Sequence, residues 1–111
     1  MLESALEYNI QRKMLEKTIK NSMDILILTE LRKESIMSGY DFIAFCHKKF
    51  HILMSSGTVY SVLYSLERDG LIKGMKNSKK TVYKLTGKGE ETIKVLLKAY
   101  ERIQGFITTL L

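Results

Sequence analysis

Apolar residues recur at helical spacing near the start of the chain. Leu2, Leu6, Ile10 and Met14 recur every four residues, Leu15 and Ile19 continue the stripe, and charged residues stand between them. This spacing predicts an amphipathic helix over 2–20, because positions three and four apart share one helix face. Such a helix buries its apolar stripe on the rest of the domain or on a partner.

Two further helices are predicted before residue 51. Residues 23–31 are almost continuously apolar, so the pattern alone allows a buried strand or a helix. We predict a helix there, with Ser22 as its N-cap. Residues 35–38 are predicted to be a connection, and Gly39 to begin a helix that continues to about Phe50.

The segment 56–69 has the clearest helical pattern. Its apolar residues follow the i, i+3, i+4, i+7 spacing of a buried stripe, at Val59, Val62, Leu63 and Leu66. Ser55 precedes this helix at the N-cap position. Gly70 follows it, where a left-handed backbone is favoured.

After Gly70 the pattern changes from helical to alternating. Residues 71–76 and 81–85 predict two strands joined by a lysine-rich turn at 77–80. Thr86 can cap a last helix that begins near Lys88. The apolar stripe of that helix includes Ile93, Leu96, Leu97, Tyr100, Ile103, Ile107 and Leu110. Because a domain of this size cannot bury so long a stripe, we expect a partner helix to cover part of it.

Composition sets the class of protein. The chain has 111 residues, enough for one domain, with 45% apolar and 27% charged residues, which is a globular composition. A single cysteine, Cys46, excludes an internal disulfide. No apolar run approaches the length of a membrane span, and the N-terminus with Glu3 and Glu7 does not resemble a signal peptide. We therefore expect a cytoplasmic protein with no membrane partner.

The net charge of +6 is concentrated in one stretch. Residues 55–89 carry seven basic and two acidic side chains, whereas the rest of the chain is nearly balanced. A clustered positive surface attracts polyanions more strongly than a dispersed one. The simplest alternative is a solvated lysine-rich face that only keeps the protein in solution.

The order of elements distinguishes these alternatives. Three helices, a basic hairpin and a long helix are typical of a winged helix-turn-helix, in which one helix enters the major groove and the hairpin lies along the DNA backbone. The fold class is thus mainly α with a small β-hairpin (α+β). The residues expected to contact double-stranded DNA are polar, basic or small, namely Lys48, Ser55, Ser56, Gly57, Thr58, Tyr60, Ser61, Tyr64, Ser65, Arg68, Lys76, Lys79 and Lys80.

Four motifs resemble the PadR-like family of transcriptional regulators. They are Ser-Gly-Tyr at 38–40, Ser-Ser-Gly-Thr-Val-Tyr at 55–60, Leu-Glu-Arg-Asp-Gly-Leu-Ile at 66–72 and Tyr-Lys-Leu-Thr-Gly-Lys-Gly at 83–89. The resemblance covers about residues 22–100. It implies a dimeric winged-helix protein, usually a repressor, with helix 56–69 as the recognition helix. The chain departs from the family where Ser56 and Ser61 replace commonly found prolines, which puts the DNA sequence preference in doubt.

The expected organisation has three parts: an N-terminal dimerisation helix (1–21), a winged-helix domain (22–86) and a C-terminal dimerisation helix (87–111). The expected dimer contacts are Leu6, Ile10, Ile93, Leu96, Leu97, Tyr100, Ile103 and Ile107. Two-fold symmetry then predicts a pseudo-palindromic operator. Two alternatives stay open: a winged helix that binds proteins rather than DNA, and a sensor that binds DNA only with a small molecule bound.

Other chemistry has weaker support. Family members often bind phenolic or drug-like effectors, and Tyr8, Phe42, Phe45 and Tyr100 are candidates to line an aromatic pocket, although core packing explains them more simply. Cys46, His47 and His51 supply at most three metal ligands with no carboxylate at a suitable spacing, so we expect no metal and no cofactor. Cys46 is expected to be buried rather than a redox switch. No catalytic motif is present, which predicts a protein that is not an enzyme.

Overall fold

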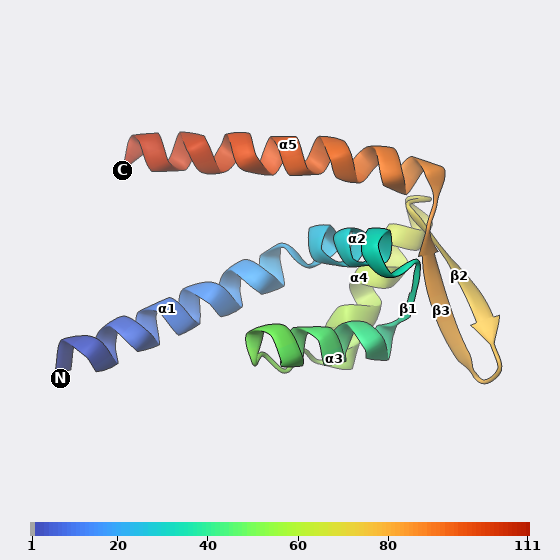
Figure 1. Cartoon of the computed structure of the whole chain (residues 1–111), viewed down its shortest axis with the longest axis horizontal. Coiled ribbons are helices and arrows are strands. Elements are labelled where there is room, and N and C mark those ends of the chain that lie inside the picture. The colour runs from blue at the N-terminus through green and yellow to red at the C-terminus, as the bar shows by residue number, and fades with distance from the viewer. Residues whose placement is uncertain (1) are drawn as a thin grey trace.

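The computed structural model describes residues 2–111, which form five helices and three strands. The helices are α1 (Leu2–Asn21), α2 (Met23–Glu34), α3 (Gly39–Phe50), α4 (Ser56–Arg68) and α5 (Gly87–Leu110). The strands are β1 (Ile36–Ser38), β2 (Ile72–Asn77) and β3 (Lys80–Leu85). All five predicted helices are confirmed, including the helix at 23–34 (Figure 1). The side chain of Leu2 lies outside the described part.

The sheet has one strand more than predicted. Residues 36–38, predicted as a connection, form the edge strand β1 of an antiparallel sheet with the order β1-β3-β2. In this sheet Met37 stands opposite Tyr83. The prediction was wrong because three residues carry no alternating pattern, and the strand that pairs with them lies far along the chain.

The hairpin formed by β2 and β3 has a shorter turn than predicted. Pairing extends from Ile72 opposite Leu85 to Asn77 opposite Lys80, which leaves Ser78 and Lys79 as the turn. Ser78 has a φ of 60°, in the left-handed region. A positive φ is what a two-residue hairpin turn requires.

The hydrophobic core lies where α2, α3 and α4 pack together against the sheet. Ile27 and Leu28 of α2, Phe42 of α3 and Val59 of α4 are each at most 2% exposed. Helix α5 joins this core through Ile93, which has no exposed surface. The ion pair between Arg32 Nε and Glu90 Oε1, at 2.9 Å, also connects α2 to α5.

Ser22 stands at the N-cap of α2 but does not cap it with its side chain. Its backbone N–H donates to the carbonyls of Thr18 and Ile19, so the last turn of α1 continues almost directly into α2. The backbone of Ser22, with φ −110° and ψ 20°, is not the extended conformation that a side-chain cap uses. The predicted cap is therefore wrong in its chemistry, although the boundary is right.

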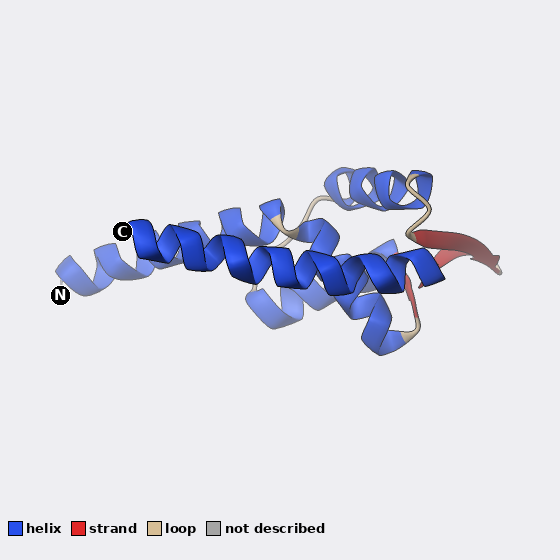
Figure 2. Ribbon diagram, turned by 90° about the horizontal axis from the view of Figure 1, so that it is seen from above, coloured by secondary structure: helices blue, strands red, loops and turns tan. Residues whose placement is uncertain are grey.

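Two helical arms extend from this body. Helices α1 and α5 both point away from the hairpin, and both termini lie at the end opposite to it (Figures 1 and 2). Arg12 anchors α1 by donating to the carbonyl oxygens of Phe50 at 2.7 Å and His51 at 2.5 Å, at the C-terminus of α3. A cation at this end of a helix satisfies carbonyl groups that have no partner within the helix.

Candidate nucleic-acid interface

The N-terminus of α4 is capped and exposed. Ser55 Oγ accepts a hydrogen bond from the backbone N–H of Thr58 at 3.2 Å, and it also lies 2.7 Å from Thr58 Oγ1. Ser56, Gly57 and Thr58 are all exposed, and a Cβ added to Gly57 would meet no atom within 4 Å. This helix end therefore presents hydroxyl groups, and the positive end of the helix dipole, to any anionic partner.

The predicted contact residues of α4 do not all share one face. Gly57, Ser61, Tyr64 and Arg68 lie opposite the buried stripe of Val59, Leu63 and Leu66 and are exposed. Ser61 and Ser65 line an open groove of about 520 Å³ between α4, the α1–α2 junction and α5. Arg68, in the last turn, donates to Ser65 Oγ at 3.5 Å. Ser65 thus faces the groove rather than the exposed face, and Arg68 shares the exposed face but lies at the opposite end of α4 from Ser56 and Gly57.

Tyr60 lies at the contact between α3 and α4 and is half-buried. A Cβ added to Gly39 would lie 2.6 Å from Cζ of Tyr60, so the absence of a side chain at residue 39 makes room for this ring. The ring also lies 6.1 Å from that of Tyr64, measured between centroids. Tyr60 therefore fixes how α3 meets α4, besides reaching the surface beside the exposed Tyr64.

The hairpin carries the lysines away from the body. Lys76, Lys79 and Lys80 are exposed around the turn, where Lys76 pairs with Thr81 and Lys80 with Asn77. The pKa of Asp41, at the start of α3, is lowered by a hydrogen bond from the Ser38 backbone and further by the charge of Lys80. Lys80 is thus close enough to the start of α3 for its charge to act there.

Lys48 has a different environment from the hairpin lysines. It stands in the last turn of α3 and lines a hollow of about 310 Å³ with Phe45 and Ile36. The same hollow is lined by the carboxylates Glu30, Glu34 and Asp41. Because acidic groups surround Lys48, its charge adds less to a positive surface than the charges of the hairpin lysines do.

Glu67 and Gly74, which lie outside the predicted set, connect α4 to the hairpin. The backbone N–H of Gly74 in β2 donates to Glu67 Oε2 at 2.7 Å. Burial raises the pKa of Tyr83 in β3, and the nearby groups Glu67, Tyr64 and Tyr60 raise it further. A glycine inside a strand often marks the close approach of another group, so the glycine at residue 74 is the one sequence signal of this contact.

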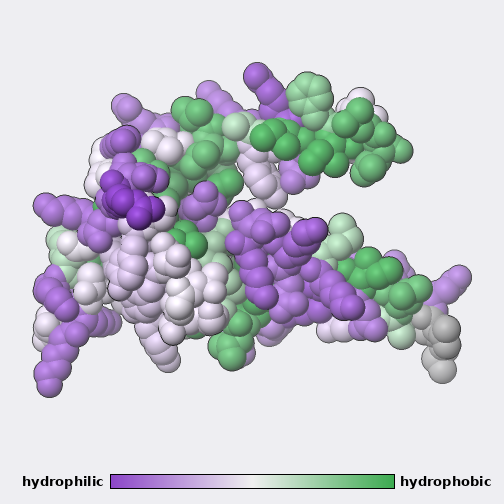
Figure 3. All heavy atoms as spheres, turned by 180° about the vertical axis from the view of Figure 1, so that it is seen from behind, coloured by the Kyte–Doolittle hydropathy of each residue, from purple (hydrophilic) through white to green (hydrophobic). Residues whose placement is uncertain are grey.

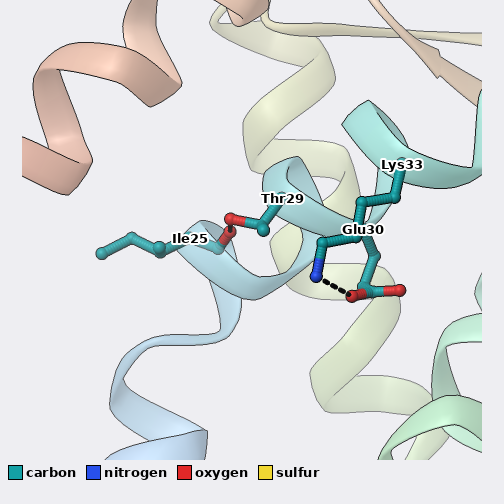
Figure 4. A network of polar contacts seen from close by, with 4 residues as sticks. All are labelled: Ile25, Thr29, Glu30 and Lys33. Carbon is teal, nitrogen blue, oxygen red and sulfur yellow. Dashed lines mark hydrogen bonds and ion pairs between the residues drawn. The ribbon is translucent and has the colours of Figure 1, made fainter.

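Cys46 and the two histidines do not form a site. Cys46 is fully buried, and burial, with a contribution from Glu30, raises the pKa of its thiol to about 11. Glu30 itself is 8% exposed and pairs with Lys33 at 3.6 Å (Figure 4). A neutral, buried thiol is a poor redox sensor. Within residues 2–111, no group of three metal-binding side chains comes together.

The four candidate aromatic residues are likewise not gathered into a pocket. Phe42 is buried in the core, and its ring centroid lies 6.0 Å from that of Phe45 on the same helix. Tyr8 and Tyr100 lie on the two arms, α1 and α5. No aromatic pair among the described residues joins either tyrosine to these phenylalanines.

The predicted dimer contacts fall into two classes. Leu6 and Ile10 of α1, with Leu97, Ile103 and Ile107 of α5, are between 38% and 60% exposed. Apolar surface accordingly covers the free ends of both arms (Figure 3). Ile93, by contrast, is enclosed in the core of its own chain and Leu96 packs against that core, so Ile93 has no surface left for a partner. Tyr100 is half buried. Further exposed apolar residues on the arms are Tyr8, Met14, Val95, Phe106 and Leu110.

Comparison with known proteins identifies relatives of the whole arrangement. The model of the transcriptional regulator PadR-like family matches residues 27–95, more than half of the chain. A PadR family transcriptional regulator from Eggerthella lenta DSM 2243 is similar in structure, with a TM-score of 0.77 at 18% sequence identity over 96% of both chains. No curated protein sequence matches the chain.

Two more solved structures share the fold. A transcriptional regulator from Clostridium thermocellum has a TM-score of 0.75 at 24% identity, covering 85% of this chain and 94% of the other. F93 from STIV, described as a winged-helix DNA-binding protein, has a TM-score of 0.62 at 24% identity, covering 77% and 91%. At these identities the similarity establishes the winged-helix fold. None of the helices within 2–111 is both long and apolar enough to cross a membrane.

Proposed function

Because the chain belongs to the PadR-like family of transcriptional regulators, we propose that it is a homodimeric repressor that binds a pseudo-palindromic operator in double-stranded DNA. As a member of this family it is a regulator with a winged-helix fold, and it is not an enzyme. In the proposed complex α4 is the recognition helix, and the β2–β3 hairpin lies on the DNA backbone.

The observation that carries the proposal is the placement of two surfaces on one side of the molecule. Helix α4 begins beside α3 and ends near α5, so its N-terminus is on the side away from α5 (Figure 1). The hairpin turn, with its exposed lysines, extends toward the same side. A groove-reading helix and a cationic hairpin in this relation match the way winged helices bind duplex DNA.

The two surfaces have different expected roles. The exposed hydroxyl groups of Thr58 and Ser61 can bond to phosphates or to base edges in the major groove. Lys76, Lys79 and Lys80 surround the hairpin turn, which in this arrangement lies on the DNA backbone, so they neutralise phosphates and add affinity without sequence preference. Operator choice therefore depends on the start of α4, and much of the affinity on the hairpin.

The proposal of a homodimer rests on the arms. Two helices that extend beyond the body with exposed apolar side chains are costly in water unless another surface covers them. In a two-fold dimer, the α1 and α5 of one protomer supply that surface for those of the other. The two recognition helices would then address half-sites about 34–36 Å apart, or a multiple of this distance.

The hairpin lysines provide the test of DNA binding. We predict that Lys79→Ala/Lys80→Ala weakens binding to every duplex tested and lowers the slope of log affinity against log salt by about two. Fluorescence anisotropy at several salt concentrations measures both quantities. The control is Lys17→Ala/Lys98→Ala, which removes the same charge from α1 and α5. If the hairpin variant loses no more DNA affinity than the control variant, the hairpin lysines do not contact DNA. That result would favour a winged helix that binds proteins.

A further inference from the structure

Glu67 makes an unusual contact for an acidic residue at a DNA-facing surface. It stands on α4, yet its carboxylate accepts a hydrogen bond from the backbone of the hairpin, at Gly74. The distance of 2.7 Å is in the range of a charge-assisted hydrogen bond. Strand β2 is an edge strand, so this N–H has no neighbouring strand on its outer side. The recognition helix thus supplies a partner that the sheet lacks.

Gly74 is shaped for this contact. A Cβ added to it would lie 2.9 Å from Glu67 Oε2 and 3.2 Å from Cε1 of Tyr83. Any side chain at residue 74 would therefore displace the carboxylate, which is the free end of a flexible side chain. The pair of a strand glycine and a helix glutamate is complementary in both size and charge.

The hairpin is held on both of its edges at the residue pair formed by Gly74 and Tyr83. On one side, β1 pairs with β3 at Val82, Tyr83 and Lys84. On the other, Glu67 holds β2 at Gly74, the residue that pairs with Tyr83. From that level to the turn the hairpin has only two strands, and an isolated two-stranded hairpin is marginally stable in water. The direction of the lysine-bearing tip therefore depends on these two attachments.

We propose that Glu67 is a positioning residue that fixes the angle between the recognition helix and the hairpin, so that both reach DNA together. The inference rests on the proposed DNA binding. Glu67 carries a negative charge, which opposes the approach of phosphates. Any favourable effect of Glu67 on DNA affinity must therefore come from the placement of other groups, and the sign of the mutational effect separates the two roles.

The test compares two substitutions at this residue by fluorescence anisotropy with a labelled duplex of random sequence. Glu67→Ala removes the acceptor and the charge, and we expect about tenfold weaker binding, the effect of losing one charge-assisted hydrogen bond. The hairpin lysines remain and can still reach the phosphates, so the loss is the cost of orienting the hairpin on binding, and the salt slope stays that of the wild type. Glu67→Gln keeps an acceptor oxygen for Gly74 and should bind at least as tightly as the wild type.

Two outcomes would overturn the proposal. Glu67→Ala that binds as tightly as the wild type, or more tightly, would show that the residue acts only through its charge or not at all. Equal losses in Glu67→Ala and Glu67→Gln would show that the hydrogen bond to Gly74 is not what matters.

Gly74→Ala changes the hairpin side of the same contact, because its Cβ would lie 2.9 Å from Glu67 Oε2. If both variants act by breaking this contact, the double variant should bind DNA no more weakly than the weaker of the two single variants. Independent, additive losses would contradict the proposal. Hydrogen exchange at the Gly74 amide gives a readout without DNA, and it should be faster in Glu67→Ala than in the wild type. Failure of the wild type to bind any duplex would instead refute the proposed function, while the amide exchange would still test the contact.

Discussion

At the scale of single residues, Gly89 has the most demanding surroundings of the glycines. A Cβ there would lie 2.1 Å from the backbone carbonyl oxygen of Leu71, which cannot move aside as a side chain can. The same carbonyl accepts hydrogen bonds from the backbone N–H and the hydroxyl of Thr86, both at 3.0 Å. The start of α5 is thus joined to the segment after α4 at one crowded point, which sets where the last helix begins.

This crowding predicts opposite effects for two glycines of α5. We expect Gly89→Ala to lower the free energy of unfolding by about 1–3 kcal/mol, the usual cost of forcing extra volume into a packed site. Gly105→Ala, in the same helix with no atom within 4 Å of the added Cβ, should raise it by up to about 1 kcal/mol, the difference in helix propensity. Urea denaturation measures both, and equal effects would contradict the packing at Leu71.

Residues with local signals could be predicted from the sequence, and residues that act through tertiary contacts could not. Ser55 and Gly70 were found because a cap and a left-handed helix end depend on their immediate neighbours. Glu67 and Arg12 looked like ordinary surface charges, since their partners are backbone groups of other elements. Ile93 was expected at a dimer contact because periodicity shows that a face is apolar but not what covers it.

At the scale of elements, α4, the proposed recognition helix, shows how local capping sets where a helix begins. Ser55 supplies the side-chain cap, and Ser56 follows at the first helical position, where a proline is common in the family that the chain resembles. Proline suits this position because its φ is already helical and its missing N–H has no partner within the helix. The structure is consistent with this, since Ser55 accepts from the N–H of Thr58 through its hydroxyl and from the N–H of Val59 through its carbonyl.

We therefore predict opposite changes at these two serines. Ser55→Ala should lower the free energy of unfolding by about 1 kcal/mol through loss of the cap. Ser56→Pro should raise it by about 0.4–1 kcal/mol, because it restricts the unfolded chain without breaking a native hydrogen bond. Thermal unfolding of the two variants beside the wild type checks both signs. A destabilised Ser56→Pro would mean that the first turn of α4 needs the Ser56 N–H.

The helices of this chain were easier to predict than its sheet. Most of the helices have an apolar stripe of their own, so residues near in sequence define them, whereas the almost continuous apolar run of α2 also allowed a strand. Strand β1 exists only through its pairing with β3, in the register that places Ile36 opposite Lys84. Three residues without that partner carry too little pattern to be distinguished from a loop.

At the scale of the whole molecule, the chain is elongated, with extents of 52 × 30 × 21 Å. Its length comes from the arms, which point away from the hairpin and carry exposed apolar residues (Figure 3). The proposed dimer predicts that these arms meet those of a second copy. Symmetry would then set the spacing of the two recognition helices, and with it the spacing of the operator half-sites.

The dimer is tested by placing charges on α5. We expect light scattering after size-exclusion chromatography to give twice the chain mass for the wild type and the monomer mass for Ile103→Glu/Ile107→Glu, because carboxylates cannot be buried unpaired in an apolar interface. Gly105→Glu/Thr108→Glu adds the same charges to the other side of the helix and should stay dimeric. A dimeric Ile103→Glu/Ile107→Glu variant would place the interface elsewhere.

The most direct test of the central claim is the binding of the wild-type protein to duplex DNA. Fluorescence anisotropy should be measured with the DNA upstream of its own coding sequence and with a random duplex, each at two salt concentrations. We predict tight binding to the upstream DNA, weaker binding to the random duplex and a steep loss of affinity as salt rises. Indifference to both duplexes at low salt would contradict a DNA-binding repressor.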